Sequence, residues 1–115
     1  PVALRGGLAP AVRRRLIEHI DASLDRTITL KELATLAGLS EFHLQRMFRA
    51  SCGVSPHVLV LYRRIDRARR MLAGSDPIAQ IATACGFSSQ SHMTRMFKTV
   101  TGTTPSAFRR CIVKA

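Results

Sequence analysis

Residues 38–48 of the chain, GLSEFHLQRMF, return later as residues 86–97, GFSSQSHMTRMF. Both copies then continue through a basic residue to a glycine and a proline, in GVSP at 53–56 and in GTTP at 102–105. The second copy holds one extra residue between its glycine and the middle of the segment that follows. Two copies are too few for a solenoid, so the repeat predicts two similar structural units.

The apolar residues recur at helical spacing nearly everywhere, and no segment alternates long enough to predict a strand. The sequence therefore predicts an all-α fold of about seven helices. They are expected, with their capping residues, at about Pro10 to Leu24, Thr29 to Gly38, Ser40 to Ser51, Pro56 to Ala73, Asp76 to Gly86, Ser88 or Ser89 to Gly102, and Thr104 to Phe108.

Capping signals define several of these boundaries. Thr29 and Glu32 form a T-x-x-E capping box, in which each side chain binds a backbone N–H of the other residue. Gly38 supplies the left-handed backbone conformation that a tight turn after a helix needs. Asp76 is expected to cap the fifth helix, with Pro77 at its first position.

Each copy of the repeat reads as a helix, a short turn at a glycine and a second helix. Small residues such as Ala34 and Ala82 stand where two crossed helices would approach most closely. This is the helix-turn-helix arrangement of homeodomain-like units, in which the second helix enters the major groove of DNA. One such copy is a moderate signal, and two in register are a strong one.

The side of the later helix that faces away from the core carries the residue types that read DNA. Leu44 and Phe48 are expected to point inward, so the outer face is lined at i, i+3, i+4 and i+7 by Phe42, Gln45, Arg46 and Arg49. Arginine can bind guanine, glutamine can bind adenine, serine and threonine can donate or accept, and an aromatic ring can contact a thymine methyl group. The predicted base-reading residues are Phe42, Gln45 and Arg46 in the first copy, and Gln90, Ser91, Thr94 and Arg95 in the second.

Phosphate contacts are expected around these faces, because basic residues one turn further on meet the DNA backbone more readily than the bases. The predicted phosphate contacts are Arg49, Lys98, Arg63, Arg67, Ser40 and Ser89. Arg63 and Arg67 belong to an arginine-rich helix that also carries Arg64, Arg69 and Arg70, with Asp66 placed to pair with Arg70.

Three alternatives are open from the residues alone. The Phe42 ring either stands exposed toward DNA or folds back onto the domain. Arg46 and Arg95 either read bases or pair with an acid inside the protein. The arginine-rich helix either contacts DNA or presents an ordinary solvated face.

Charge and geometry favour DNA as the partner. The 115 residues hold 18 Lys and Arg against 7 Asp and Glu, a formal net charge of +11, which suits a polyanion, although an arginine-rich composition alone can arise from a GC-rich genome. The central helix from Pro56 to Ala73 would be about 27 Å long. A spacer of that size suits two reading helices about 34 Å, or one DNA turn, apart. The two reading faces differ, so the expected site is asymmetric.

The cysteines and histidines favour no metal site, cofactor or catalytic role. Cys52, Cys85 and Cys111 form no C-x-x-C pair and have no histidine at ligand spacing, as expected of free thiols in a reducing cytoplasm. No nucleophile and base stand in a recognisable arrangement, so an enzyme is not expected. A helical module that binds acidic proteins, with only non-specific DNA affinity, is the alternative function.

The sequence resembles the AraC/XylS family of bacterial transcription regulators over roughly residues 9–110. The resemblance rests on LKELATLAGLSEFHLQRMFRASCGVSP, on RRIDRARRML, and above all on IAQIATACGFSSQSHMTRMFKTVTGTTPSAFRR. It implies two helix-turn-helix units joined by a linker helix, which bind promoter DNA near the bacterial nucleoid and usually activate transcription. The residues named above at 42, 45 and 46, and at 90, 91, 94 and 95, occupy the base-contacting places of that family.

The resemblance also suggests how the chain is organised. Residues 1–8 are expected to be the remnant of a linker, and residues 9–115 the DNA-binding domain. Within it, residues 9–55 form the first unit, 56–74 the linker helix and 76–110 the second unit. Expected partners beyond double-stranded DNA are RNA polymerase and an N-terminal effector or dimerisation domain of a longer parent chain, although some relatives consist of the DNA-binding domain alone.

Overall fold

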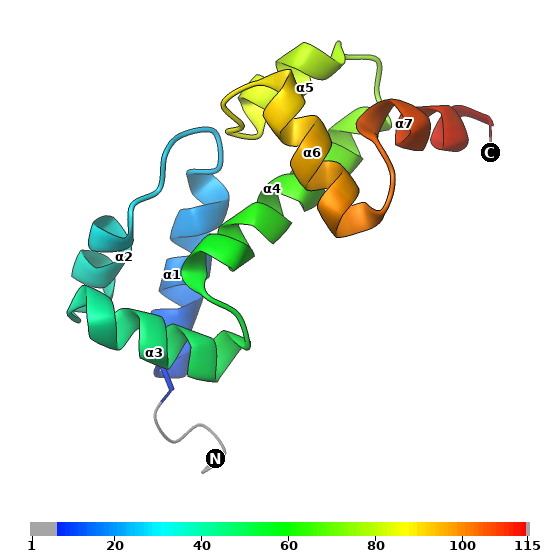
Figure 1. Cartoon of the computed structure of the whole chain (residues 1–115). Helices are drawn as coiled ribbons and strands as arrows, with labels where there is room; N and C mark the ends of the chain where they lie inside the picture. Colours follow the sequence, from blue (N-terminus) through cyan, green and yellow to red (C-terminus); the bar gives the residue numbers. More distant parts are fainter. Residues whose placement is uncertain (1–6, 115) are drawn as a thin grey trace. The chain divides into compact units, whose positions relative to one another are not determined.

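The computed structural model describes residues 7–114, and the side chains of residues 7–112 (Figure 1). The described residues form seven helices and no strand, as the sequence predicts. They divide into two compact units, of which the first comprises the described residues up to Ser23 and residues 27–60, and the second residues 24–26 and those from Leu61 onward. The helices are α1 (Pro10–Ala22), α2 (Leu30–Ala37), α3 (Glu41–Cys52), α4 (Pro56–Leu72), α5 (Ile78–Ala84), α6 (Gln90–Thr101) and α7 (Pro105–Lys114).

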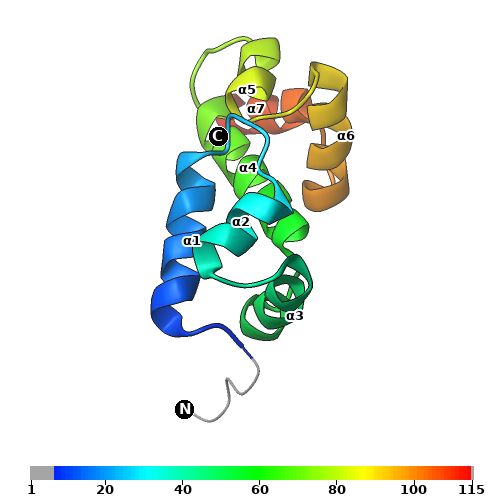
Figure 2. The ribbon, with the colours of Figure 1, turned by 90° about the vertical axis from the view of Figure 1, so that its left-hand side faces the viewer.

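Unit 1 is built from α1, α2, α3 and the start of α4. The capping box at the start of α2 forms as predicted, because Thr29 Oγ1 accepts from Glu32 N at 3.1 Å and Glu32 Oε1 accepts from Thr29 N at 3.1 Å. Helix α2 ends at Gly38, whose φ of 70° lets the chain turn directly into α3 (Figure 2). Helix α2 packs on both α1 and α3.

The core of unit 1 follows the helical periodicity of its sequence. Leu16 and Ile20 of α1 and Leu44 and Phe48 of α3 are completely buried. Leu33 and Ala34 of α2 are also buried, and the small Ala34 stands near the end of α2, where the helix approaches α3. Burying these apolar side chains is what stabilises helices as short as the eight residues of α2.

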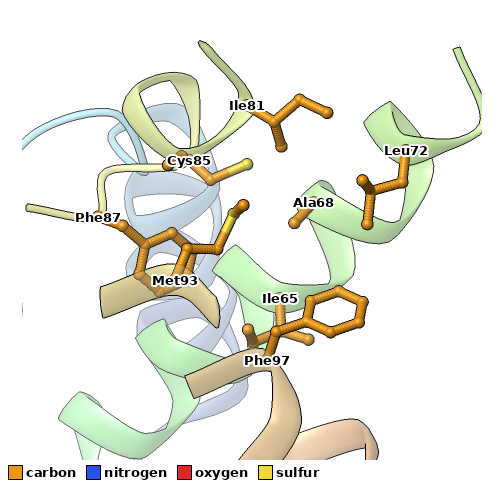
Figure 3. Close-up of a cluster of buried hydrophobic side chains, with 9 residues drawn as sticks. Ile65, Ala68, Leu72, Ile81, Cys85, Phe87, Met93 and Phe97 are labelled. Atoms are coloured by element: carbon orange, nitrogen blue, oxygen red, sulfur yellow. The ribbon is translucent and has the colours of Figure 1, made fainter. Parts of the chain in front are cut away.

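Unit 2 repeats this plan with α5 and α6, and adds α7 and most of α4. Its core is a cluster in which α4 faces the second helix pair (Figure 3). Phe97 and Phe108 stack edge to face with ring centroids 5.5 Å apart, which attaches α7 to α6. The buried members of the cluster are Ile65, Ala68, Leu72, Ile81, Ala82, Cys85, Phe87, Met93 and Phe97.

The turns of the two units have the same hydrogen-bond pattern. Leu39 N donates to Ala34 O at 3.0 Å in the first turn, and Phe87 N donates to Ala82 O at 3.0 Å in the second. The extra residue of the second copy is Ser88, which stands between Phe87 and the cap residue of α6. The insertion therefore lengthens the turn and leaves the register of the following helix intact.

Two predicted boundaries are wrong. Asp76 does not cap α5: the ψ of Pro77 is 141°, so Pro77 is the cap residue, and its carbonyl accepts the first helical bonds, from Gln80 N and Ile81 N. Helix α7 continues to Lys114 rather than ending at Phe108, because no glycine or proline follows Pro105. The other helices begin and end within about two residues of their predicted places.

The N-terminal segment is described only in part. Residues 1–6 of the predicted linker lie outside the described residues. Leu8 is buried, and its N–H donates to Ser51 Oγ at 2.6 Å, so this residue packs as part of unit 1. Within the described chain, no helix has the length and apolar content needed to cross a membrane.

Candidate nucleic-acid interface

The exposed side of α3 presents the residues that the sequence predicts to read bases. Phe42, Gln45, Arg46 and Arg49 are all exposed, whereas Leu44 and Phe48 on the opposite side are fully buried. The helix is held by its core face, and the outer face is free to meet a partner. We call these four residues the α3 face.

Phe42 and Arg46 form a pair within the α3 face. Phe42 is 67% exposed, which excludes the alternative that its ring folds back onto the domain. The Arg46 guanidinium carbon lies 5.8 Å from the ring centroid, within the range of a cation–π contact. The ring therefore limits the directions in which the guanidinium can point.

The exposed side of α6 carries the second set of predicted residues. Gln90, Ser91, Arg95 and Lys98 are exposed and Thr94 is half-buried, while Met93 and Phe97 are fully buried behind them. The five polar residues line one open hollow of the surface, and we call them the α6 face. Their side chains offer donors and acceptors but no aromatic ring, so the two faces differ chemically.

Serines begin both of these helices. Ser40 Oγ accepts from His43 N at 3.1 Å, and Ser89 Oγ accepts from His92 N at 3.0 Å. These bonds satisfy N–H groups that would otherwise lack a partner at the start of a helix. The hydroxyls thus have a structural role, and the predicted phosphate contacts of Ser40 and Ser89 stay predictions.

Histidines follow each cap at the same place in the repeat. His43 Nδ1 lies 3.0 Å from Ser40 Oγ, whereas His92 Nδ1 lies 3.1 Å from the hydroxyl of the extra residue, Ser88. The His92 ring also packs edge to face against Phe87, with centroids 5.4 Å apart. Both rings therefore help to order the turn that leads into the exposed face.

Neither Arg46 nor Arg95 is paired with an acid among the side chains of residues 7–112, and both are exposed. The alternative that they are internal ion-pair partners therefore has no support in this part of the chain. Both guanidinium groups keep donors available for a ligand that carries acceptors.

The arginines of α4 differ in their contacts and in their exposure. Arg70 pairs with Asp66 one turn earlier, as predicted. Arg63 and Arg67 are half-buried, and Arg63 interacts within the chain, so their phosphate contacts stay predictions. Arg64 does not belong to the outer face: its Nε donates to Leu24 O at 3.2 Å and its Nη2 to Arg26 O at 2.8 Å.

Arg64 and Arg109 are structural residues that the sequence does not single out. Arg109 Nε donates to Leu72 O at 3.1 Å, which fixes α7 on the end of α4. The acceptors lie 40 and 38 residues from Arg64 and 37 residues from Arg109. No local pattern marks such a pairing, because the acceptors are backbone carbonyls that any residue could supply.

The cysteines show no arrangement suited to catalysis or metal binding. Cys85 is completely buried, its thiol lies 3.8 Å from the sulfur of Met71, and burial raises the pKa of this thiol. A protonated buried thiol is a poor nucleophile. Among residues 7–112, no three histidine, cysteine or acidic residues gather as a metal site would require.

The fold and the two exposed faces define a DNA-binding domain with two helix-turn-helix units. A helix-turn-helix domain family matches residues 33–111, most of the chain. The multiple antibiotic resistance protein MarA of Salmonella typhimurium is 30% identical over 95 residues, which cover 82% of this chain and 75% of MarA. The chain belongs to the AraC/XylS family of transcriptional regulators.

Further relatives are longer proteins. The HTH-type transcriptional regulator GlxA of Rhizobium meliloti is 38% identical over 98 residues, or 83% of this chain and 30% of GlxA. The probable transcriptional regulator LumQ of Photobacterium leiognathi is 33% identical over 92 residues, or 79% of this chain and 37% of LumQ. The chain thus spans about a third of the length of these two relatives. The relatives are regulators, in agreement with the prediction that the chain is not an enzyme.

Solved structures agree with the fold. A transcriptional regulator with an AraC-type DNA-binding domain from Chromobacterium violaceum superposes with a TM-score of 0.83 at 28% identity, covering 90% of this chain and 94% of that one. The DNA-binding domain of AdpA, a global transcriptional factor solved in complex with a target DNA, superposes with a TM-score of 0.81 at 26% identity, covering 86% and 90%. The fold of this chain is accordingly that of an AraC-type DNA-binding domain.

Proposed function

We propose that the chain recognises a specific, asymmetric DNA site by placing α3 and α6 in two successive major grooves. The observation that carries the proposal is the same in both units. The second helix of each pair has two apolar side chains completely buried on one side and leaves a side rich in hydrogen-bonding groups exposed; the buried side chains are Leu44 and Phe48 in α3, and Met93 and Phe97 in α6. An exposed helix face of this kind fits the width of the major groove.

Each face suits a different type of base. In the α3 face, Arg46 would bind guanine through its two forked donors, Gln45 would bind adenine, and Phe42 would contact a thymine methyl group. In the α6 face, Arg95 would again bind guanine, with Gln90, Ser91 and Thr94 around it. Arg49 and Lys98 would bind the flanking phosphates, and this difference between the faces makes a palindromic site unsuitable.

The spacing of the two blocks follows from α4. This helix is continuous over 17 residues, hence about 26 Å long at 1.5 Å per residue. A spacer of this length suits reading helices about 34 Å apart, one turn of DNA. Residues 9–55 and 76–110 would each serve one block, with residues 56–74 between them.

Regulation of bacterial transcription, most simply activation, is proposed from family membership. So are RNA polymerase and an N-terminal effector or dimerisation domain as further partners. The competing function, a basic module that binds acidic proteins, predicts DNA binding without sequence preference.

Selection of bound duplexes from a random pool tests the proposal. The expected result is two conserved blocks about one turn apart and different in sequence. Arg46→Ala should cost about 1–3 kcal/mol on the selected site and little on random DNA, and Arg95→Ala should act in the same way at the other block. Arg14→Ala removes the same charge from an exposed position of α1 and serves as the control. Equal losses on selected and random DNA would make Arg46 a phosphate contact.

A further inference from the structure

Three residues that follow α1 belong to unit 2, although they lie far from it in sequence. They are Leu24–Arg26, and unit 2 otherwise begins at Leu61. Leu24 is 3% exposed, and two bonds from Arg64 hold this segment, to the carbonyls of residues 24 and 26. One planar guanidinium thus spans two carbonyls that are two residues apart.

The turn of the second helix pair lies against the same segment. A Cβ atom on Gly86 would lie 1.9 Å from Leu24 O and 2.9 Å from Arg64 Nε, both closer than real contacts allow. A side chain at position 86 is therefore unfavourable for two reasons. The φ of 81° is one that residues with a Cβ rarely adopt, and the Leu24 carbonyl occupies the place of the Cβ. Arg64 Nε, Leu24 O and Gly86 make a three-part contact, which we call the turn clamp.

Arg64 is suited to this place because of its charge and shape. Its Nε and Nη2 are two donors in one fixed plane, and they reach both carbonyls. Burial lowers the pKa of the guanidinium from its ordinary value, and a lysine ammonium would lose more hydration there and could not match the fork. The half-buried side chain is thereby directed toward the Leu24–Arg26 segment of unit 2.

The clamp stands immediately before the α6 face. Only Phe87, Ser88 and Ser89 separate Gly86 from Gln90, the first residue of that face. Phe87 packs in the same buried cluster as Met93 and Phe97 of α6, so a shift at Gly86 that moves the Phe87 ring would disturb the packing of α6. Recognition depends on such placement, because misplacing a base-reading side chain by about an ångström breaks its hydrogen bonds.

We propose that Arg64 is a positioning residue for DNA recognition: it holds Leu24–Arg26 against the turn at Gly86 and so fixes where the α6 face begins, without touching DNA itself. This inference rests on the proposed function, because it assigns a positioning role to a residue behind one of the two reading faces. The corresponding turn of unit 1 has no such clamp, since nothing lies within 4 Å of a Cβ on Gly38.

The test compares Arg64→Gln, Arg64→Lys and the control Arg69→Gln, which removes the same charge from an exposed position of the same helix. Each variant is first shown to be folded at the assay temperature by its thermal unfolding curve. Affinity is then measured for the selected duplex and for duplexes altered in one block at a time, where the block lost in Arg95→Ala is assigned to α6.

The expected result is a loss of discrimination, about tenfold or more, at the α6 block in both Arg64 variants, with the α3 block unaffected. The dependence of affinity on salt should keep its slope, because no phosphate contact is removed. Equal losses on every sequence, with a slope reduced by about 0.9, would make Arg64 a phosphate contact and overturn the inference. Full rescue by Arg64→Lys, or equal loss at both blocks, would overturn it as well.

A measurement without DNA separates this inference from the proposed function. Backbone amides of residues 86–90 should exchange hydrogen faster in Arg64→Gln than in Arg69→Gln if the clamp orders the turn. Unchanged exchange would contradict the inference whatever the DNA result. If the natural chain selects no sequence, the proposed function fails, and exchange alone decides whether Arg64 positions the turn.

Discussion

Phe42 is a side chain whose exposure is unfavourable for the isolated protein, and the proposed role in recognition would explain it. Its ring keeps two-thirds of its surface in water, at 67% exposure, on a helix whose other side is packed. The contact with Arg46, 5.8 Å from the centroid, recovers only a little stability at an exposed site. In the proposed complex with DNA, the ring would bury more of its surface against a thymine methyl group than it buries against the protein.

Replacing Phe42 separates these contributions. We expect Phe42→Ala to change the free energy of unfolding by less than about 0.5 kcal/mol, because an exposed side chain is removed. We expect it to weaken binding to the selected duplex by about 1 kcal/mol, and Phe42→Leu, which keeps an apolar contact but not the ring, to lose less. Fluorescence anisotropy titrations and denaturant unfolding measure the two quantities. A loss of stability larger than the loss of affinity would make Phe42 a packing residue.

The three cysteines differ in burial, and their reactivity should differ accordingly. Cys111 is exposed, Cys52 is half-buried, and Cys85 is buried in the core of unit 2. Burial raises the pKa of both Cys52 and Cys85, which keeps these thiols protonated and slow to react. We expect iodoacetamide to modify Cys111 first, and Cys85 only as fast as the domain unfolds. Mass spectrometry of peptides during labelling follows each site.

The raised pKa of Cys85 also has a consequence for stability. A thiol that loses its proton less readily in the folded than in the unfolded state stabilises the fold fully below its unfolded pKa. That contribution is lost as the pH rises through the folded pKa. The unfolding midpoint should therefore fall at alkaline pH, and it should fall less in Cys85→Ala. Equal pH dependence of the two proteins would contradict this assignment.

At the scale of elements, the two helix-turn-helix units have the same arrangement of helices, but their turns differ in how well they tolerate a side chain at the glycine. Both turns use a glycine at positive φ, 70° at Gly38 and 81° at Gly86. The two turns differ in the space around the glycine. A Cβ on Gly38 would meet nothing within 4 Å, whereas a Cβ on Gly86 would lie 1.9 Å from a backbone carbonyl oxygen. Equivalent positions in the repeat thus carry unequal constraints.

An alanine at each glycine measures that difference. Gly38→Ala should destabilise the chain by about 1–2 kcal/mol, the cost of a left-handed conformation for a residue with a Cβ. Gly86→Ala should cost clearly more, because the backbone must also move away from Leu24 O. Chemical denaturation of the two variants provides the comparison. Equal costs would show that the turn moves freely, and would weaken the case for the turn clamp.

For the whole molecule, the net charge of +11 would contribute affinity for DNA rather than sequence preference in the proposed complex. Each phosphate that an arginine or lysine neutralises releases counterions from the DNA, so affinity falls as salt rises. The predicted phosphate contacts include four cationic residues, Arg49, Arg63, Arg67 and Lys98. They are the contacts whose loss should change the salt dependence.

The salt dependence is therefore a quantitative test at this scale. With four such contacts, the slope of log K against log salt should be about −3.6, at roughly 0.9 per phosphate. Lys98→Gln should reduce its magnitude by about 0.9 and weaken binding to all sequences alike, while Arg69→Gln should leave it unchanged. Filter binding or anisotropy at several salt concentrations gives the slope. A value near zero would exclude backbone neutralisation as the source of affinity.

Much of the fold could be predicted because its elements are specified locally. The capping box at Thr29, the serine caps at residues 40 and 89, and the glycine turns all depend on residues within about five positions of one another. The buried sides of α3 and α6 follow from helical spacing in the same way. The one cap that failed, Asp76, was predicted beside a proline, and the ψ of that proline shifted the helix start by one residue.

The sequence by itself determined the seven helices, the repeat, and which sides of α3 and α6 are polar, since short-range backbone and side-chain chemistry suffices for these. Only the tertiary structure decided that the Phe42 ring stays in water, that Arg64 turns inward while Arg70 pairs on the surface, and that Gly86 lies under a carbonyl as Gly38 does not. The reason is distance along the chain. Arg64 and Leu24 are separated by 40 residues, and their contact exists only after the helices have packed.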